Sequence, residues 1–179
     1  MTDYDLLRLL YRYLDKEALF REHPELTKQD LDGLFRRLAA ATKAPRTELL
    51  AYFDGATQGN PGSSAAGVII LDKEGNTIEE LGLPLGKCTN NEAEYKALLI
   101  AVERLLELKA SHITLVTDSE LLYNQFQGTY RIKQPHLAQL HLRAREFLRQ
   151  FASWKIELIP RGENKRADSL ASTALAQLK

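Results

Sequence analysis

The sequence predicts an α/β domain built on a mixed β-sheet, preceded by a small helical module. Leucines recur at helical spacing within residues 1–43. From Glu48 onward, short apolar runs are separated by Gly, Asn and Pro, and later runs alternate with helical patterns. Strands that first follow one another and then alternate with helices are typical of a mixed sheet covered on its faces. We therefore divide the chain into residues 1–45, a helical module of unknown role, and residues 46–179, the main domain.

The module is expected to contain two helices. Leucines from Leu6 to Leu14 share one face of the first, and the second begins at Thr27, which can form a capping interaction with Asp30. Residues 1–45 carry eight basic and eight acidic side chains, so there is no basic surplus for binding phosphates. We expect the module to form a homodimer or to pack on the following domain, rather than to be a helix-turn-helix. The segment TKAPRT, residues 42–47, is the expected linker.

The elements of the main domain follow from the pattern in order. Three antiparallel strands come first, with the sequences ELLAYF, AAGVIILD and TIEELGLPL. A helix from about Asn90 to Leu108, a strand HITLVTD and a short helix from Ser119 come next. An amphipathic helix between Leu137 and Phe151, a strand WKIELIP and a last helix from about Asn164, which we expect to cap it, complete the chain.

The composition is that of an ordinary globular protein. The 179 residues are 44% hydrophobic, which is enough for a normal core. Lys and Arg total 24 and so do Asp and Glu, so the net charge does not indicate a polyanionic partner. The single cysteine, Cys88, excludes an internal disulfide, and no apolar run is long enough to span a membrane. The start MTDYDLLR has acids where a secretory signal has basic residues, so we expect a cytoplasmic protein.

Acidic residues at the ends of buried strands are the first functional signal. The first strand runs into Asp54 and at once into a loop with three glycines and a proline, FDGATQGNPG. The segment LVTDSE ends a second buried strand with Asp118. A tight hairpin turn is an alternative explanation for the first segment alone. The repeated pattern favours a site, because an acid beside a glycine-rich loop can hold a cation or make room for a ligand.

Two helices add acids that face inward. Glu94 precedes the apolar stripe of its helix at helical spacing, and Asp168 similarly leads Ala171 and Leu175. A carboxylate turned inward is unfavourable unless it is paired or bound to a metal. Since no His or Cys cluster accompanies these acids, an all-oxygen site favours Mg²⁺ or Mn²⁺, and two such ions can act on a phosphodiester. N-capping and compensation of the helix dipole are the alternative for each acid taken separately.

Four segments together resemble a known family. FDGATQGNPG, TNNEAEYKAL, TDSELL and RGENKRADSLA, in this order and spacing, closely resemble the signature blocks of the type 1 ribonuclease H family, especially its archaeal-like branch without a handle. The resemblance covers about residues 48–179. It implies a ribonuclease H-like fold with a five-stranded mixed sheet in the order 3-2-1-4-5, and endonucleolytic hydrolysis of the RNA strand of an RNA/DNA hybrid. The catalytic, metal-binding carboxylates it implies are Asp54, Glu94, Asp118 and Asp168.

The resemblance also implies contacts to the minor groove of the hybrid. Gly59 and Asn60 lie in the glycine-rich loop, which lets the backbone approach the groove, and Asn91 resembles a second contact. The 2′-hydroxyls in this groove distinguish RNA from DNA. Asn60 can alternatively serve only to form the turn.

A further implied contact is with the DNA strand. Lys87 and Thr89 resemble the pocket that binds a phosphate of this strand, although Thr89 also fits an N-cap. Both roles can coexist at a helix N-terminus. Thr89 and Glu92 form a T-x-x-E capping box, which predicts a structural role for Glu92 near solvent.

Two features depart from the common family pattern. Many relatives carry a histidine in a mobile loop before the last Asp, whereas Arg161 resembles the residue that replaces it in the archaeal-like branch, where it assists product release. The Trp-rich basic handle is missing, and residues 129–150, with five basic side chains and one acid, stand in its place. Arg131, Lys133 and Arg143 are expected to bind substrate there, with a solvated helix face as the alternative.

Three functions are weighed. The first is a divalent-metal-dependent ribonuclease H that uses two Mg²⁺ ions, with Mn²⁺ as a substitute. The second is a non-catalytic ribonuclease H-like module that binds nucleic acid. The presence of all four acids argues against it. The third, a proofreading exonuclease, would need an Asp-x-Glu pair on the first strand, which Asp54-Gly55-Ala56 lacks. Cleavage of double-stranded RNA is left open.

Overall fold

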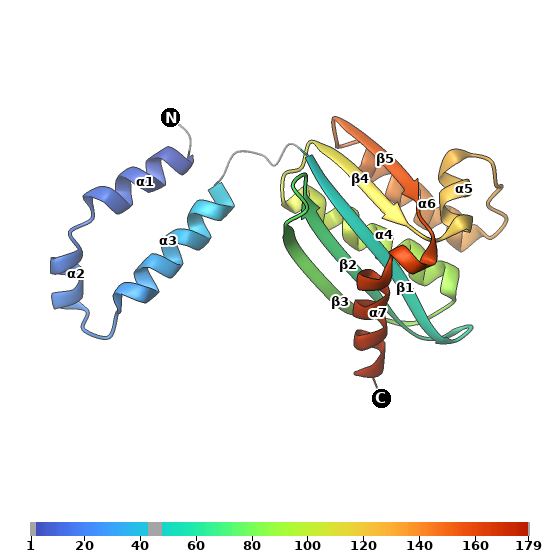
Figure 1. The fold of residues 1–179 in the computed structure, drawn as a ribbon, viewed down its shortest axis with the longest axis horizontal. Helices are drawn as coiled ribbons and strands as arrows, with labels where there is room; N and C mark the ends of the chain where they lie inside the picture. The colour runs from blue at the N-terminus through green and yellow to red at the C-terminus, as the bar shows by residue number, and fades with distance from the viewer. Residues whose placement is uncertain (1–2, 43–47, 179) are drawn as a thin grey trace. The chain divides into compact units, whose positions relative to one another are not determined.

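The computed structural model describes residues 3–42 and 48–178. The chain divides into two compact units, Met1–Pro45 and Arg46–Lys179 (Figure 1). Apart from residue 42, the expected linker lies outside the described residues. None of the helices in the two described ranges is long and apolar enough to cross a membrane.

The first unit contains three helices, α1 (Asp3–Tyr13), α2 (Lys16–Glu22) and α3 (Lys28–Thr42), so the expectation of two helices was wrong. The break arises because Asp15 caps a new helix: its side chain accepts a hydrogen bond from the amide of Ala18 at 2.9 Å. The predicted capping interaction at the start of α3 is confirmed. The Thr27 amide donates to Asp30 Oδ2 at 3.0 Å, and the Asp30 amide donates to Thr27 Oγ1 at 3.2 Å.

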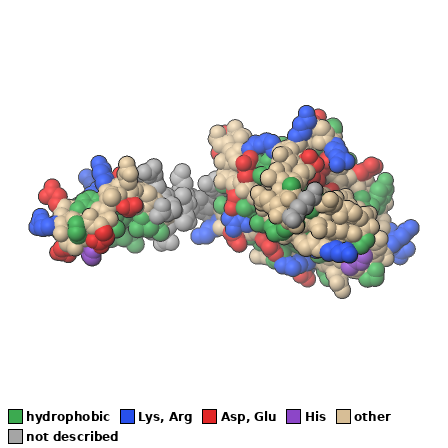
Figure 2. Space-filling view, turned by 90° about the horizontal axis from the view of Figure 1, so that it is seen from below, with side chains coloured by type: hydrophobic (Ala, Val, Ile, Leu, Met, Phe, Trp, Pro, Cys, Tyr) green, Lys and Arg blue, Asp and Glu red, His purple; other side chains and the backbone are tan. Residues whose placement is uncertain are grey.

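The first unit leaves much of its apolar surface open to solvent. No side chain described in this unit is buried, and Leu10 and Tyr13 are 57% and 76% exposed. Tyr11 and Phe35 join α1 to α3, with ring centroids 4.6 Å apart. Figure 2 shows hydrophobic side chains at the surface of this unit.

The second unit is built on a five-stranded mixed sheet. Its strands are β1 (Glu48–Gly59), β2 (Gly62–Asp72), β3 (Thr77–Cys88), β4 (His112–Thr117) and β5 (Ser153–Leu158). The spatial order is β3-β2-β1-β4-β5, which confirms the predicted order. β1, β2 and β3 pair antiparallel, whereas β4 pairs parallel with both β1 and β5.

Helices cover both faces of this sheet (Figure 1). They are α4 (Asn90–Glu107), α5 (Glu120–Gln127), α6 (Pro135–Leu148) and α7 (Lys165–Ala176), with a 3-10 turn at Arg161–Glu163 before α7. α7 packs on β1, β2 and β3, while α4 packs on β1 and β2 from the other face and contacts α6. The loops before α4 and α7 therefore bring these helix starts to the sheet.

The main core lies between the sheet and α4. Phe53, Leu98, Val102 and Leu115 are fully buried there. Burying one such side chain contributes roughly 1.5–3 kcal/mol to folding. Because these residues fix the rotation of α4 about its axis, they also fix the direction in which the first turn of α4 presents its side chains.

Candidate active site

Asp54 and Asp118 lie side by side because of the parallel pairing of β1 and β4. Tyr52 is paired with Val116. Asp54 lies two residues further along β1, and Asp118 directly follows Thr117, the last residue of β4. The expectation that Asp54 ends its strand was wrong, because the glycine-rich segment after it continues β1 to Gly59 and pairs with β2. Neighbouring strands are about 4.8 Å apart, so Asp54 in the middle of β1 lies near Asp118 at the carboxyl end of β4.

The first turn of α4 separates Glu92 from Glu94. The Glu92 carboxylate accepts hydrogen bonds from the Thr89 amide at 2.8 Å and the Thr89 hydroxyl at 2.7 Å, which confirms the predicted capping box. Glu94 turns inward and is only 7% exposed. One of its oxygens, Oε2, is buried without a hydrogen-bond partner. A buried, unsatisfied carboxylate oxygen is unfavourable unless a ligand or ion meets it.

Gly55 allows the start of α4 to lie directly on β1. A Cβ atom at this position would stand 2.4 Å from the carbonyl carbon of Ala93 and from the amide nitrogen of Glu94. Any side chain here would push the helix away. The glycine after Asp54 therefore sets Glu94 beside Asp54.

Asp168 lies half-buried in the first turn of α7, which Asn164 precedes. Asn164 was expected to cap this helix, but its side chain makes no capping bond. Its Nδ2 instead donates to the carbonyl oxygen of Phe53 at 3.0 Å and to Asp118 Oδ1 at 2.9 Å. Asn164 is 1% exposed, so from a buried position it joins the start of α7 to the middle of β1 and to the residue that follows β4.

Two of these acids have raised pKa values. Burial, together with the charges of Asp118 and Asp168, raises the pKa of Asp54 to about 6. Burial also raises the pKa of Glu94 well above its ordinary value, with further contributions from Asp54 and Asp118.

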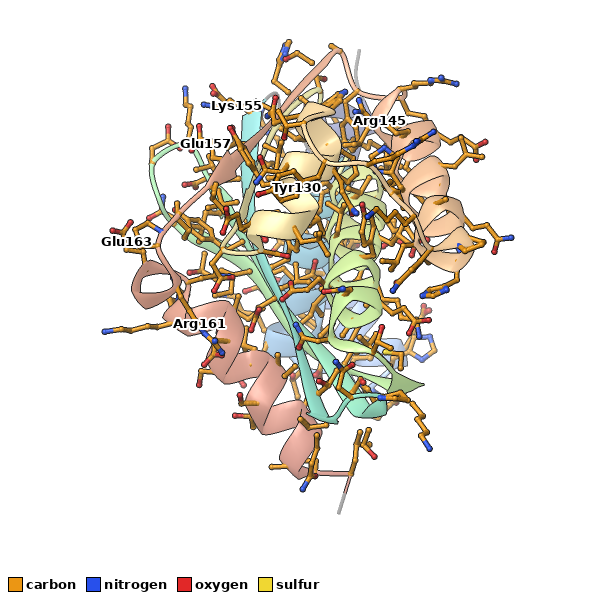
Figure 3. The ribbon with its side chains drawn as sticks, turned by 90° about the vertical axis from the view of Figure 1, so that its right-hand side faces the viewer. Tyr130, Arg145, Lys155, Glu157, Arg161 and Glu163 are labelled. Atoms are coloured by element: carbon orange, nitrogen blue, oxygen red, sulfur yellow. The ribbon has the colours of Figure 1, made fainter. Side chains whose placement is uncertain are left out.

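Two groups oppose these shifts. A hydrogen bond from the Gly55 backbone and the charge of Arg161 lower both pKa values. Figure 3 shows Arg161 in the turn before α7. The predicted residue Arg161 is therefore within electrostatic reach of the carboxylates.

The residues present fit a hard divalent cation. The four side chains offer carboxylate oxygens alone, the donors that Mg²⁺ and Mn²⁺ prefer. A cation would offset both the burial and the mutual repulsion of Asp54 and Glu94, and it would meet the unpaired Glu94 Oε2. Within residues 3–42 and 48–178, no three His, Cys, Asp or Glu side chains are already close enough to hold a metal ion. The four carboxylates are therefore the residues that could hold such a cation.

The glycine-rich loop lies against the start of α4. Gly59 adopts a φ of 87°, which favours glycine, and the exposed Asn60 accepts a hydrogen bond from the Asn90 amide at 3.2 Å. The loop is thereby held next to Asn91. Lys87 is exposed at the end of β3, two residues before Thr89. The predicted minor-groove residues and the predicted phosphate contacts thus surround one helix start.

A second group of predicted residues lines a cavity of about 440 Å³. Its walls are formed by Asn91, Leu121, Gln125, Thr129, Tyr130, Arg131, Lys133, Gln134 and Leu137. The cavity thus brings Arg131 and Lys133 together with Asn91, which lies 40 residues earlier. Tyr130, 46% exposed and labelled in Figure 3, was not predicted, because a lone aromatic residue in a loop gives no periodic signal.

Other basic side chains of residues 129–150 are held by the protein itself. Arg143 forms a surface ion pair with Glu103 at 2.8 Å, in which its side chain stays 59% exposed, and its expected role in substrate binding stays a prediction. Arg145 donates to the carbonyl oxygen of Phe126 at 2.6 Å and lies over the ring of Trp154. The basic excess of this segment is therefore partly structural.

Comparison with known proteins gives matches to the second unit. The family model described as "Reverse transcriptase-like" matches residues 52–174. Ribonuclease HI of Halobacterium salinarum is 42% identical over 125 residues, which is 70% of this chain, and the chain spans 63% of the length of that protein. The crystal structure of ribonuclease H1 from this organism matches with a TM-score of 0.71 and 41% identity, over 73% of this chain and 98% of that one. LC11-RNase H1, in a structure in complex with an RNA/DNA hybrid, matches with a TM-score of 0.69 and 34% identity, over 73% and 98%.

Proposed function

Because the chain belongs to the ribonuclease H family, we propose that it is a divalent-metal-dependent endonuclease that hydrolyses the RNA strand of RNA/DNA hybrids. One observation carries the proposal above all. Asp54 in β1 and Glu94 in α4 are buried and have raised pKa values; the charges of Asp118, after β4, and Asp168, in α7, contribute to the shift of Asp54, and those of Asp54 and Asp118 to the shift of Glu94. Such an arrangement is unfavourable for folding and is typical of a functional site.

We propose that these four carboxylates hold Mg²⁺, with Mn²⁺ as a substitute. Two bound ions would supply activation of the attacking water and stabilisation of the leaving oxygen of the phosphodiester. The chain itself orients the ligands: Asn164 holds one oxygen of Asp118, and the Gly55 backbone stabilises the charged forms of Asp54 and Glu94. Arg161, at the edge of this group, is proposed to assist product release.

Substrate contacts are proposed on both sides of the start of α4. Asn60 and Asn91 would read the minor groove, where the 2′-hydroxyls mark the RNA strand. The Thr89 hydroxyl already donates to Glu92, so it cannot donate to a phosphate without losing that bond. We therefore propose that Lys87 supplies the charged contact to the DNA phosphate. The cavity next to Asn91 would accept the backbone through Arg131 and Lys133.

Removing both basic side chains of the cavity, Arg131→Ala with Lys133→Ala, is expected to raise the KM for hybrid and to flatten its dependence on salt. Each lost phosphate contact should reduce the slope of log KM against log salt concentration by about one, and kcat at saturation should stay within about twofold. The measurement is KM at four or five salt concentrations. The matched control, Lys73→Ala with Lys155→Ala, removes the same charge from surface ion pairs. Equal slopes for the two double variants would assign Arg131 and Lys133 to a solvated surface.

A substrate panel tests the proposed function. The purified protein is incubated with Mg²⁺ and with an RNA/DNA hybrid labelled on either strand, a DNA duplex of the same sequence, or double-stranded RNA. We expect internal cuts in the RNA strand of the hybrid, an intact DNA strand and an intact DNA duplex. Binding of the hybrid without any cut would support the alternative, a non-catalytic nucleic-acid-binding module. The double-stranded RNA lane decides whether this is a second substrate.

A further inference from the structure

Gly67 of β2 belongs to a row of cross-strand neighbours that includes Asp54 and that α7 crosses. In the sheet, Gly67 is paired with Asp54 on β1 and with Gly82 on β3. α7 passes over this row and carries Asp168 in its first turn. Gly67 therefore lies between Asp54 of β1 and α7, the helix that carries Asp168.

The contact at Gly67 is between two backbones. A Cβ atom on Gly67 would stand 2.0 Å from the carbonyl oxygen of Ala167 and 2.6 Å from the amide nitrogen of Ala171. Real Cβ atoms do not approach a backbone so closely, so even alanine would displace α7. Ala167 is the residue directly before Asp168, and both alanines are fully buried. A shift of the helix at this point therefore moves Asp168.

Gly82 provides a comparison on the same helix. A Cβ atom there would stand 2.9 Å from the carbonyl oxygen of Leu170 and 3.3 Å from the Cβ of Ala174. This contact is looser and lies further along α7, beyond Asp168. Both glycines serve the packing of α7, but only Gly67 contacts Ala167, the residue next to Asp168.

We propose that Gly67 is a positioning residue for Asp168. Its missing side chain allows α7 to rest on β2 opposite Asp54, so that the Asp168 carboxylate reaches the other acids and shares in metal binding. The role of Asp168 as a metal ligand rests on the proposed function.

The test compares Gly67→Ala with Gly82→Ala. Both variants are expected to lose stability in urea unfolding, since both widen the contact of α7 with the sheet. Only Gly67→Ala should weaken Mn²⁺ binding in calorimetry without substrate, and lower kcat, each by roughly 10- to 100-fold, because a misplacement near 1 Å has effects of this size. The KM for hybrid should change by less than about twofold, since the substrate contacts lie elsewhere.

Two outcomes would overturn the inference. One is a folded Gly67→Ala protein whose Mn²⁺ affinity and kcat equal those of Gly82→Ala. If Gly67→Ala does not fold, Ala171→Ser lifts the same turn of α7 from the other side of the contact, and unchanged Mn²⁺ affinity in that variant would overturn it as well. A wild-type protein that neither binds Mn²⁺ nor cuts hybrid would instead overturn the proposed function, and the inference with it.

Discussion

Replacing Glu94 by Gln is expected to remove nearly all Mg²⁺-dependent cleavage of hybrid, whereas the same change at Glu92 should leave the enzyme active. The two residues lie two positions apart, about 200° around α4. Glu94 turns inward with one oxygen lacking a partner, and Glu92 turns back to the Thr89 cap. Losing a metal ligand forfeits several kcal/mol of transition-state stabilisation, or roughly 100-fold or more in rate.

Glu92→Gln serves as the matched control for Glu94→Gln. Glutamine also occurs in capping boxes, so the free energy of unfolding should fall by no more than about 1 kcal/mol. The measurements are single-turnover cleavage rates and urea unfolding for both variants. An inactive Glu92→Gln beside an active Glu94→Gln, with both folded, would show that the metal-binding carboxylate has been assigned to the wrong side of α4.

Asp118→Asn is expected to be inactive yet at least as stable as the wild type when divalent cations are absent. Asparagine keeps the shape of the side chain and can still accept the hydrogen bond from Asn164. It removes a charge that raises the pKa values of Asp54 and Glu94. An acid whose pKa is raised on folding destabilises the fold once the pH exceeds that pKa, so at pH 7 the loss of the Asp118 charge relieves repulsion.

The measurements for Asp118→Asn are thermal unfolding at pH 7 in EDTA and cleavage of hybrid in Mg²⁺. Glu120→Gln is the control, since it removes an exposed acid two residues further on, in the first turn of α5. This control should remain active and gain no stability. Near-normal turnover by a folded Asp118→Asn protein would remove Asp118 from the proposed site.

Features set by local periodicity were predictable from the sequence. The apolar runs before Asp54 and Asp118 indicated buried strands, and the parallel pairing of these strands brings the two acids together. The continuation of β1 past Asp54 to Gly59 was missed, because glycine and proline suggested a loop there. The helical spacing of α4 likewise predicted that Glu92 turns to the Thr89 cap and Glu94 turns inward, as observed. The strand order came from the resemblance of four motifs to a family, because long-range pairing leaves no signal in a single sequence.

Features that depend on long-range contacts were missed. Asn164 looked like a helix cap because it precedes a helix, but its amide reaches Phe53, 111 residues earlier in the chain. The ion pair of Arg143 with Glu103 was not foreseen either, because the two residues lie 40 positions apart. The helix break at Asp15 was overlooked because the leucine pattern continues to Leu14. The dimerisation of residues 1–45, or their packing on the main domain, stays a prediction.

The most direct test of the central claim is the metal dependence of cleavage in wild type and Asp54→Asn, measured on a hybrid with a labelled RNA strand. Asp54 interacts electrostatically with each of the other three acids. The charges of Asp118 and Asp168 raise its pKa, and its own charge raises the pKa of Glu94. We predict internal RNA cuts by the wild type in Mg²⁺, none in EDTA, and at least roughly 100-fold slower cleavage by a folded Asp54→Asn protein. Equal cleavage by both proteins, or cleavage by the wild type in EDTA, would contradict a carboxylate-bound metal as the basis of catalysis.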